Sequence, residues 1–271
     1  MKIGIITYHF ARNYGAILQC YALQEQLRSM GHDVWVLNFQ NDRQERNNSL
    51  HHKRDGFLSN LAVNVALLPF EGKRRSKERK FAEYESRYLH LTPRFYSIEE
   101  MRDFVNKESF DLLISGSDQV FNPNIADFDE AFLFPFETSA RKGSFAASLG
   151  SATETELAPF SDDLASFDVL CVRENTDAPV VNSLCGRSPE VVDDPVFLLD
   201  SKRWAQAVNT SVEDCGYVLG YYINKEASAR YLELTKQAAS ELGLPLKVIN
   251  VRYGRDSFKR CLLYTSPSPR D

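Results

Sequence analysis

A short polar segment, Gly116 to Gln119, follows directly after the apolar run Phe110 to Ser115. Its glycine allows a ligand to approach the backbone, and its alcohol, carboxylate and amide can hydrogen-bond sugar hydroxyls or orient a general acid. In open α/β sheets, ligands bind outside the carboxyl ends of the strands. The segment predicts a site with Asp118 as the candidate catalytic residue, while a helix cap by Ser117 or Asp118 is the ordinary alternative.

A second apolar run, Val169 to Val172, ends in Arg173 and Glu174. A guanidinium at the rim of a sheet offers a fork of donors that suits a planar carboxylate or a phosphate. The alternative is a structural ion pair of Arg173 with Glu174 or Asp194. We expect both Arg173 and Glu174 to contribute to substrate binding, and the ion pair stays open.

The loop from His9 to Gly15 lies where a dinucleotide-binding fold would carry GxGxxG, but it has a single glycine, which disfavours nicotinamide and flavin cofactors. Gly15 would let backbone N–H groups approach an anion, and Asn13 could cap the following helix. A plain tight turn explains the loop equally well. Asn13 and Gly15 are therefore candidate substrate-binding residues.

The remaining reactive side chains form no recognisable cluster. The five histidines lie in loop, polar or boundary segments, and none is convincing as a general base. The five cysteines show no CxxC pair and no Cys/His spacing, which predicts a reducing compartment and no metal site.

The elements that must position these residues begin with one β-α-β unit. An apolar run from Lys2 to Tyr8 predicts a strand, Ala16 to Met30 predicts a helix that Gly31 ends, and Val34 to Phe39 predicts a second strand. Strand, helix and strand in this order predict a parallel sheet. The fold class is therefore α/β, with a Rossmann-like parallel sheet.

Further elements follow the same alternation. We expect helices over Phe57 to Phe70, Arg75 to Leu89 and Ile98 to Asn106, the first two covering one sheet face. Short strands are expected over Gly143 to Ala147 and at Val191-Val192. The basic run from Lys73 to Lys80 could dock on anionic lipid head groups as a peripheral membrane contact, or it is simply a solvated face.

A second series of strand, helix and strand begins after a polar stretch near residues 206 to 216. It predicts a strand from Tyr217 to Ile223, a helix from Glu226 to Leu242 that Gly243 ends, and a strand from Leu246 to Val251. We therefore expect an N-terminal domain over residues 1–205 and the incomplete beginning of a second Rossmann-like domain over residues 206–260.

The last eleven residues, 261–271, are similar to the translation of a sequencing adapter, and we expect them to be foreign to the protein. On this reading the second domain is truncated. The alternative is a natural Ser/Pro-rich end that would not fold.

Composition narrows the function classes for this chain of 271 residues. A net charge of −5 argues against nucleic acid as a partner, because that partner is normally bound by a concentrated basic face. The opening MKIGIITYHF is too short for a signal peptide, and no window has the length of a membrane span. These features predict a cytoplasmic protein.

Five ordered blocks resemble the polysaccharide pyruvyl transferase family. They are IGIITYHFARNYGAILQCYALQEQL, DLLISGSDQVFNP, SFAASLGS, VLCVREN and VDDPVFLL, the last followed by Trp204. The resemblance covers about residues 2 to 205. It implies a two-lobed fold similar to GT-B glycosyltransferases, and transfer of a pyruvyl group from phosphoenolpyruvate to a sugar of a cell-surface polysaccharide as a ketal, with no cofactor.

The same resemblance implies roles for single residues. Arg173 matches the arginine of the family's VRE block and would bind the donor's carboxylate or phosphate, while Asn13, Gly15, Gly116, Ser117 and Gln119 would line the cleft. The catalytic base is unknown, because a histidine expected in the C-terminal lobe has no match here, which predicts an inactive fragment of an active parent enzyme. The acceptor would be a glycan or a lipid-linked oligosaccharide.

Two other functions remain open from the sequence. One is a nucleotide-sugar glycosyltransferase, because the same two-lobed architecture hosts both chemistries. The other is a binding module without catalysis. Donor preference separates the two enzymes.

Overall fold

The computed structural model describes residues 1–49, 68–208, 216–222 and 225–250. Residues 57–67 of the first predicted covering helix and the expected foreign tail, residues 261–271, lie outside this part of the chain. The chain divides into two compact units, Met1–Trp204 and Ala205–Asp271. Each unit has its own parallel sheet.

Four parallel strands form the central sheet of the first unit, in the order β2-β1-β3-β4. They are β1 (Lys2–Ile6), β2 (Asp33–Val36), β3 (Leu112–Ser115) and β4 (Arg141–Ser144). Parallel bridges from Gly143 to Val169 and from Ala147 to Val172 carry the sheet on to β5 (Cys171–Val172), which pairs with β6 (Glu190–Val191). The predicted α/β class with a Rossmann-like parallel sheet is confirmed.

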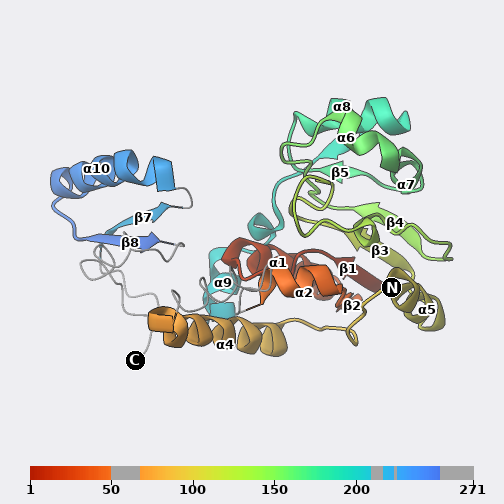
Figure 1. Cartoon of the computed structure of the whole chain (residues 1–271), viewed down its shortest axis with the longest axis horizontal. Coiled ribbons are helices and arrows are strands. Elements are labelled where there is room, and N and C mark those ends of the chain that lie inside the picture. The colour runs from red at the N-terminus through yellow and green to blue at the C-terminus, as the bar shows by residue number, and fades with distance from the viewer. Residues whose placement is uncertain (50–67, 209–215, 223–224, 251–271) are drawn as a thin grey trace. The chain divides into compact units, whose positions relative to one another are not determined.

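Helices connect these strands (Figure 1). They are α1 (Tyr14–Ser29), α2 (Asp42–Asn48), α4 (Glu71–Tyr88), α5 (Ile98–Lys107), α6 (Glu154–Leu157), α7 (Ser161–Ala165), α8 (Asp177–Cys185) and α9 (Ser201–Val208). Short 3₁₀ turns are η1 (Leu68–Phe70), η2 (Glu130–Leu133), η3 (Ala158–Phe160) and η4 (Pro195–Leu198). Within the described residues, none of these helices combines the length and the apolar character that a membrane crossing requires.

The two faces of the sheet are buried by different helices. Ile114 of β3 clusters with Leu23 of α1, whereas its neighbour Leu113 belongs to the large cluster that contains Met101 of α5. Because successive residues of a strand point to opposite faces, one short apolar strand supplies both clusters.

The start and end of α1 follow from local hydrogen bonding. Asn13 caps the helix, and its side chain accepts a hydrogen bond from the backbone N–H of Gly15. At the other end Gly31 has φ +88°, and the backbone N–H groups of Gly31 and His32 donate to the carbonyls of Arg28 and Leu27. This is the Schellman pattern, which places a glycine just after the helix.

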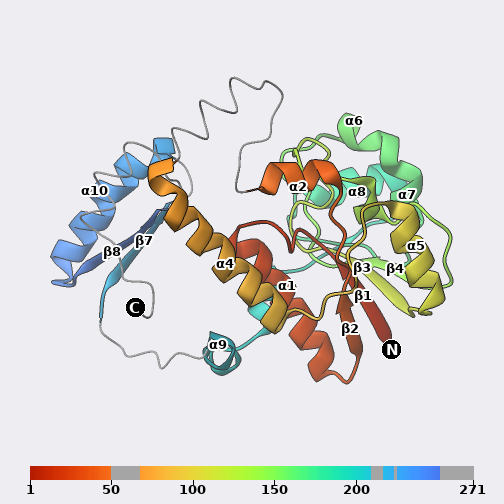
Figure 2. The same cartoon turned by 60° about the horizontal axis from the view of Figure 1, so that its bottom comes forward.

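The helix α4 packs on α1 through aromatic rings. The ring centroids of Tyr14 and Phe81 are 5.0 Å apart, and Tyr21 lies 6.1 Å from Tyr84 and 5.9 Å from Tyr88. Figure 2 shows α4 running alongside α1. The helix begins at Glu71, four residues before the predicted start at Arg75.

The second unit contains one β-α-β element. The strands β7 (Val218–Tyr222) and β8 (Leu246–Asn250) pair in parallel and are joined by α10 (Lys225–Glu241). Gly243 follows the helix with φ +64°. The strand, helix and strand predicted for this region are all present.

Candidate functional site

The carboxyl ends of β1 and β3 form the switch point of the first sheet, because the chain leaves β1 toward β2 on one side and β3 toward β4 on the other. Beyond β3, Asp118 bridges to Ala147, and Ala147 bridges to Val172. The backbone N–H of Arg173 donates to the carbonyl of Ala147 at 3.0 Å. The segments that follow β3, β4 and β5 therefore lie side by side at one edge of the sheet. This is the arrangement predicted from the polar residues at the strand ends.

Gly116, at this edge, has no room for a side chain. It has φ +119°, and a Cβ built on it would lie 2.4 Å from the carbonyl oxygen of Phe145. The close approach brings the segment after β3 against the one after β4. The approach that the structure shows is to Phe145, just after β4, and the predicted approach of a ligand to Gly116 stays a prediction.

Ser117 is buried and its polar groups are bonded inside the protein. Its hydroxyl donates to the carbonyl of Ala146 at 2.8 Å, and its backbone N–H donates to Oε1 of Gln19 at 3.1 Å. Thr7 completes the network, because its hydroxyl donates to the carbonyl of Ser117 and accepts from Nε2 of Gln19, both at 2.8 Å. This network fixes the loop beneath Asp118.

Asp118 is half-buried, with φ +81°. Burial raises the pKa of its carboxyl above the ordinary value, although the N–H of Gln119, which donates to Oδ1 at 2.8 Å, and the charge of Arg173 act against the rise. No helix begins after Ser117 or Asp118, so the helix-cap alternative is wrong. A carboxylic acid with a raised pKa can hold a proton closer to neutral pH, which is what a general acid requires.

Arg173 is held between two carboxylates. Its Nε lies 2.7 Å from Oε1 of Glu174, and its Nη1 lies 3.2 Å from Oδ2 of Asp194. Its side chain is 26% exposed, so it reaches solvent while paired. The structural ion pair left open by the sequence is therefore present with both partners, and it lies close enough to Asp118 to act on its pKa.

Glu174, the partner of Arg173, also contacts a second carboxyl group, that of Asp177. Asp177 is 5% exposed, and its Oδ2 accepts the backbone N–H of Leu149 at 2.8 Å. Burial and the neighbouring Glu174 raise the pKa of the Asp177 carboxyl. For Glu174 burial acts in the same direction, but its hydrogen bonds, led by that from Arg173, outweigh it and hold the Glu174 pKa below the ordinary value. The sequence analysis missed Asp177, because nothing in a helix beginning at that residue signals contact with a glutamate in the preceding turn.

Tyr8 is another residue that the sequence analysis missed. It follows β1 at the switch point, is 5% exposed, and its hydroxyl has no hydrogen-bond partner among the described residues. Burial, followed by the charges of Asp118, Asp127 and Asp129, raises the pKa of this phenol. The phenol of Tyr8 therefore stays neutral, and it lies within the electrostatic reach of Asp118.

The other predicted residues lie at the rim. Gln119 is half-buried, and its Oε1 accepts from Nδ2 of Asn122 at 2.8 Å. Asn13 and Gly15 are exposed, and the cap described above already uses the side-chain oxygen of Asn13. The substrate-binding roles of these residues stay predictions.

His9 is buried rather than poised for catalysis. Its Nε2 lies 3.1 Å from Oδ1 of Asn38, and its Nδ1 lies 3.2 Å from the carbonyl of Thr7. Burial lowers the pKa of the imidazole. In the described ranges, no group of three or more His, Cys, Asp or Glu side chains could hold a metal ion.

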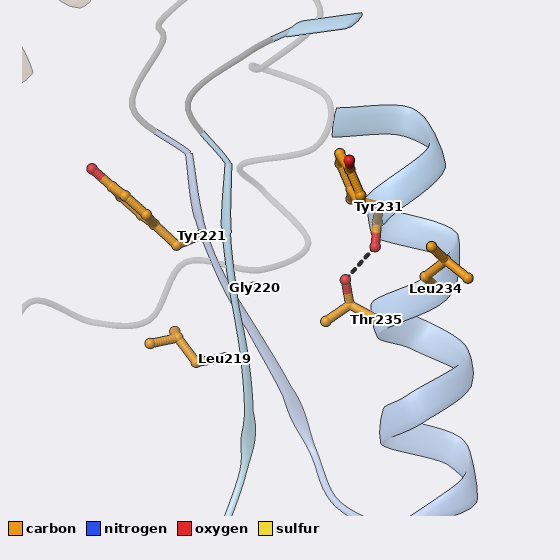
Figure 3. Close-up of a pocket in the computed structure, with 6 residues that line it drawn as sticks. All are labelled: Leu219, Gly220, Tyr221, Tyr231, Leu234 and Thr235. Carbon is orange, nitrogen blue, oxygen red and sulfur yellow. Dashed lines mark hydrogen bonds between the residues drawn. The ribbon is translucent and has the colours of Figure 1, made fainter. Parts of the chain in front are cut away.

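An open groove of about 540 Å³ lies in the second unit, lined by residues of β7 and α10. It is lined by Leu219, Gly220, Tyr221, Tyr231, Leu234 and Thr235 (Figure 3). Thr235 donates its hydroxyl to the carbonyl of Tyr231, so the one aliphatic alcohol in the lining is bonded within its own helix. Among the described residues that line it, none carries a carboxylate or a cation.

Comparison with known proteins agrees with the ordered blocks in the sequence. The family model described as polysaccharide pyruvyl transferase matches residues 13–270. No curated protein matches the chain. Because the matched range covers nearly the whole sequence and includes the switch-point segments after β3, β4 and β5, this chain belongs to the polysaccharide pyruvyl transferase family.

Proposed function

We propose that the first unit carries the site for pyruvyl transfer from phosphoenolpyruvate to a sugar of a cell-surface polysaccharide. The observation that carries the proposal is the placement of Asp118, with its raised pKa, and of Arg173 on neighbouring segments at the carboxyl edge of the sheet. Family membership supports the transferase class. The acceptor in this proposal is a glycan or a lipid-linked oligosaccharide on the cytoplasmic side.

Asp118 would serve as the general acid. Protonation of the methylene carbon by its carboxyl turns the enol phosphate into an electrophile at C2, and the oxygen of a sugar hydroxyl forms a bond to that carbon. A second hydroxyl then forms the other ketal bond as the C2–O bond to phosphate breaks. Of the two hydroxyl protons, one returns to Asp118 and the other leaves with phosphate, so the reaction is balanced without a further cofactor.

Arg173 would bind the carboxylate or phosphate of the donor. Glu174 and Asp194 hold the guanidinium in position beforehand, which reduces the ordering cost of binding. The two carboxylates also neutralise the charge of the guanidinium. An anionic donor must therefore replace at least one of these contacts. We expect further cations from outside the first unit to help hold the donor, as a GT-B-like arrangement of two lobes would allow.

Donor binding tests this assignment. Phosphoenolpyruvate should raise the melting temperature of the wild-type chain and of Arg141→Ala, an exposed control at the start of β4. Phosphoenolpyruvate should have little effect on the melting temperature of Arg173→Ala. Stabilisation by a nucleotide sugar instead would favour a glycosyltransferase, and stabilisation by glycans alone would favour a binding module.

A further inference from the structure

The first ten residues of α4 hold a strong local charge. Residues 71–80 contain six basic and two acidic side chains, a net charge of +4, whereas the whole chain has −5. The residues outside this segment therefore carry a net charge of −9. Such a segment is attracted to an anionic surface that would repel the rest of the molecule.

The structure separates the two faces of this helix. Phe81 is buried, and Lys77 turns inward, its Nζ 5.3 Å from the ring of Phe81 and 5.9 Å from the ring of Tyr14. Arg79 and Lys80 are exposed. One face therefore packs on α1, and cationic side chains lie on the outside.

An apolar residue lies at the beginning of this basic surface. Leu68 of η1 is 58% exposed, and Pro69 beside it is exposed as well. An exposed leucine next to a cluster of basic side chains combines apolar burial with charge attraction, the two contributions that bind a protein surface to anionic lipid. Nucleic acid would use the charge but not the leucine.

The helix also lies next to the candidate site. Arg12, in the loop between β1 and α1, has Nη2 3.6 Å from Oε1 of Glu78 and Nη1 3.7 Å from Oε2 of Glu85. These pairs join α4 to the loop that follows β1. A membrane bound by α4 would bring lipid-linked glycans near that edge, a step that rests on the proposed function.

We infer that η1 and the N-terminal half of α4, residues 68–80, form a docking surface for membranes that contain anionic lipid. The surface acts by charge attraction and by insertion of Leu68 into the head-group region. Docking needs no catalysis, so it can be tested even where pyruvyl transfer fails.

Co-sedimentation of the full chain with vesicles tests the inference. Wild-type protein should bind vesicles of phosphatidylcholine with 30% phosphatidylglycerol and should not bind pure phosphatidylcholine. The variant Arg79→Gln/Lys80→Gln should bind about 30-fold more weakly, because each basic residue near an anionic surface contributes a factor of about five. Raising the salt concentration should also release the protein.

The matched control is Lys107→Gln/Arg141→Gln, which removes two exposed positive charges from α5 and β4. It should bind within about two-fold of wild type, since its charges lie outside the surface. Equal binding of the α4 variant and the control would overturn the inference. So would equal binding to both kinds of vesicle, or retention on heparin without any vesicle binding.

Discussion

Two β-α-β elements of this chain share a plan but differ in burial. In β1-α1-β2 the strand residues Ile3 and Ile5 are at most 1% exposed. In β7-α10-β8 the residues Leu219 and Tyr221 are 50% and 45% exposed. Both pairs of strands are parallel, and both helices are followed by a glycine with positive φ.

The difference lies in what surrounds each element. β1 has neighbours on both edges, and side chains of α1 and α5 cover its two faces. Among the described residues β7 pairs with β8 alone, and Leu219 and Tyr221 point away from α10 (Figure 3). A parallel sheet normally has both faces covered. In the part of the chain that the structure describes, the first element joins a sheet wide enough to bring several polar strand ends together, and the second does not.

The largest contrast should appear on truncation of the two strands. Ile5→Ala removes a fully buried side chain and should lower the free energy of unfolding by about 2–5 kcal/mol. Leu219→Ala removes a half-exposed one and should cost less than about 1 kcal/mol. Urea denaturation of both variants measures the difference. Equal losses would mean that the two elements are buried alike.

Gly116 tests whether the site edge is as tightly packed as the geometry indicates. Gly116→Ala should cost about 2–3 kcal/mol, because its φ is positive and its Cβ would lie 2.4 Å from a backbone oxygen. Gly143→Ala is the control, because the nearest atom to its Cβ would be 3.7 Å away. A tolerated Gly116→Ala would show that the segments after β3 and β4 can separate.

Arg173→Ala should have an intermediate effect. It leaves Glu174 and Asp194 without their shared cation, so the free energy of unfolding should fall by about 1–2 kcal/mol, between the costs for exposed and buried pairs. The pKa of Asp118 should rise further, because the Arg173 charge lowers it. NMR titration of the Asp118 carboxyl measures this shift. An unchanged pKa would show that the charge of Arg173 does not act on Asp118.

Asp118→Asn should give the smallest change in stability, and it should be a gain. Because the pKa of Asp118 is raised in the folded protein, its ionisation destabilises the fold as pH rises through that pKa. The variant should therefore melt at a higher temperature than wild type at pH 8, with the difference vanishing below pH ~4, the ordinary range of the group. A lower melting temperature at pH 8 would show that the ionised carboxylate stabilises the protein.

Local patterns in the sequence were sufficient to predict much of the fold. Apolar runs located β1 and β3, and Gly31 marked the end of α1. Strand ends also located the candidate site, since a parallel sheet gathers its carboxyl ends at one edge. Arg173 and Asp118 were found in this way.

The residues that the sequence did not reveal act through tertiary contacts. Gln19 lies among apolar residues of α1 and is recognisable only by its hydrogen bonds to Thr7 and Ser117. Asp177 depends on the backbone of Leu149, which is 28 residues away. Tyr8 is indistinguishable in the sequence from the apolar strand residues before it, and only the structure shows that its hydroxyl is buried without a hydrogen-bond partner among the described residues.

The most direct test of the proposed site at the carboxyl edge of the first sheet is acceptor-dependent release of phosphate from phosphoenolpyruvate. It is measured with a panel of cell-surface glycans. The account predicts release by the parent enzyme expected from the sequence and by its variant Asp162→Asn, an exposed control in α7. It predicts a loss of about 10²-fold or more for Asp118→Asn, the size expected for removal of a general acid. Undiminished release by Asp118→Asn would contradict the proposed site.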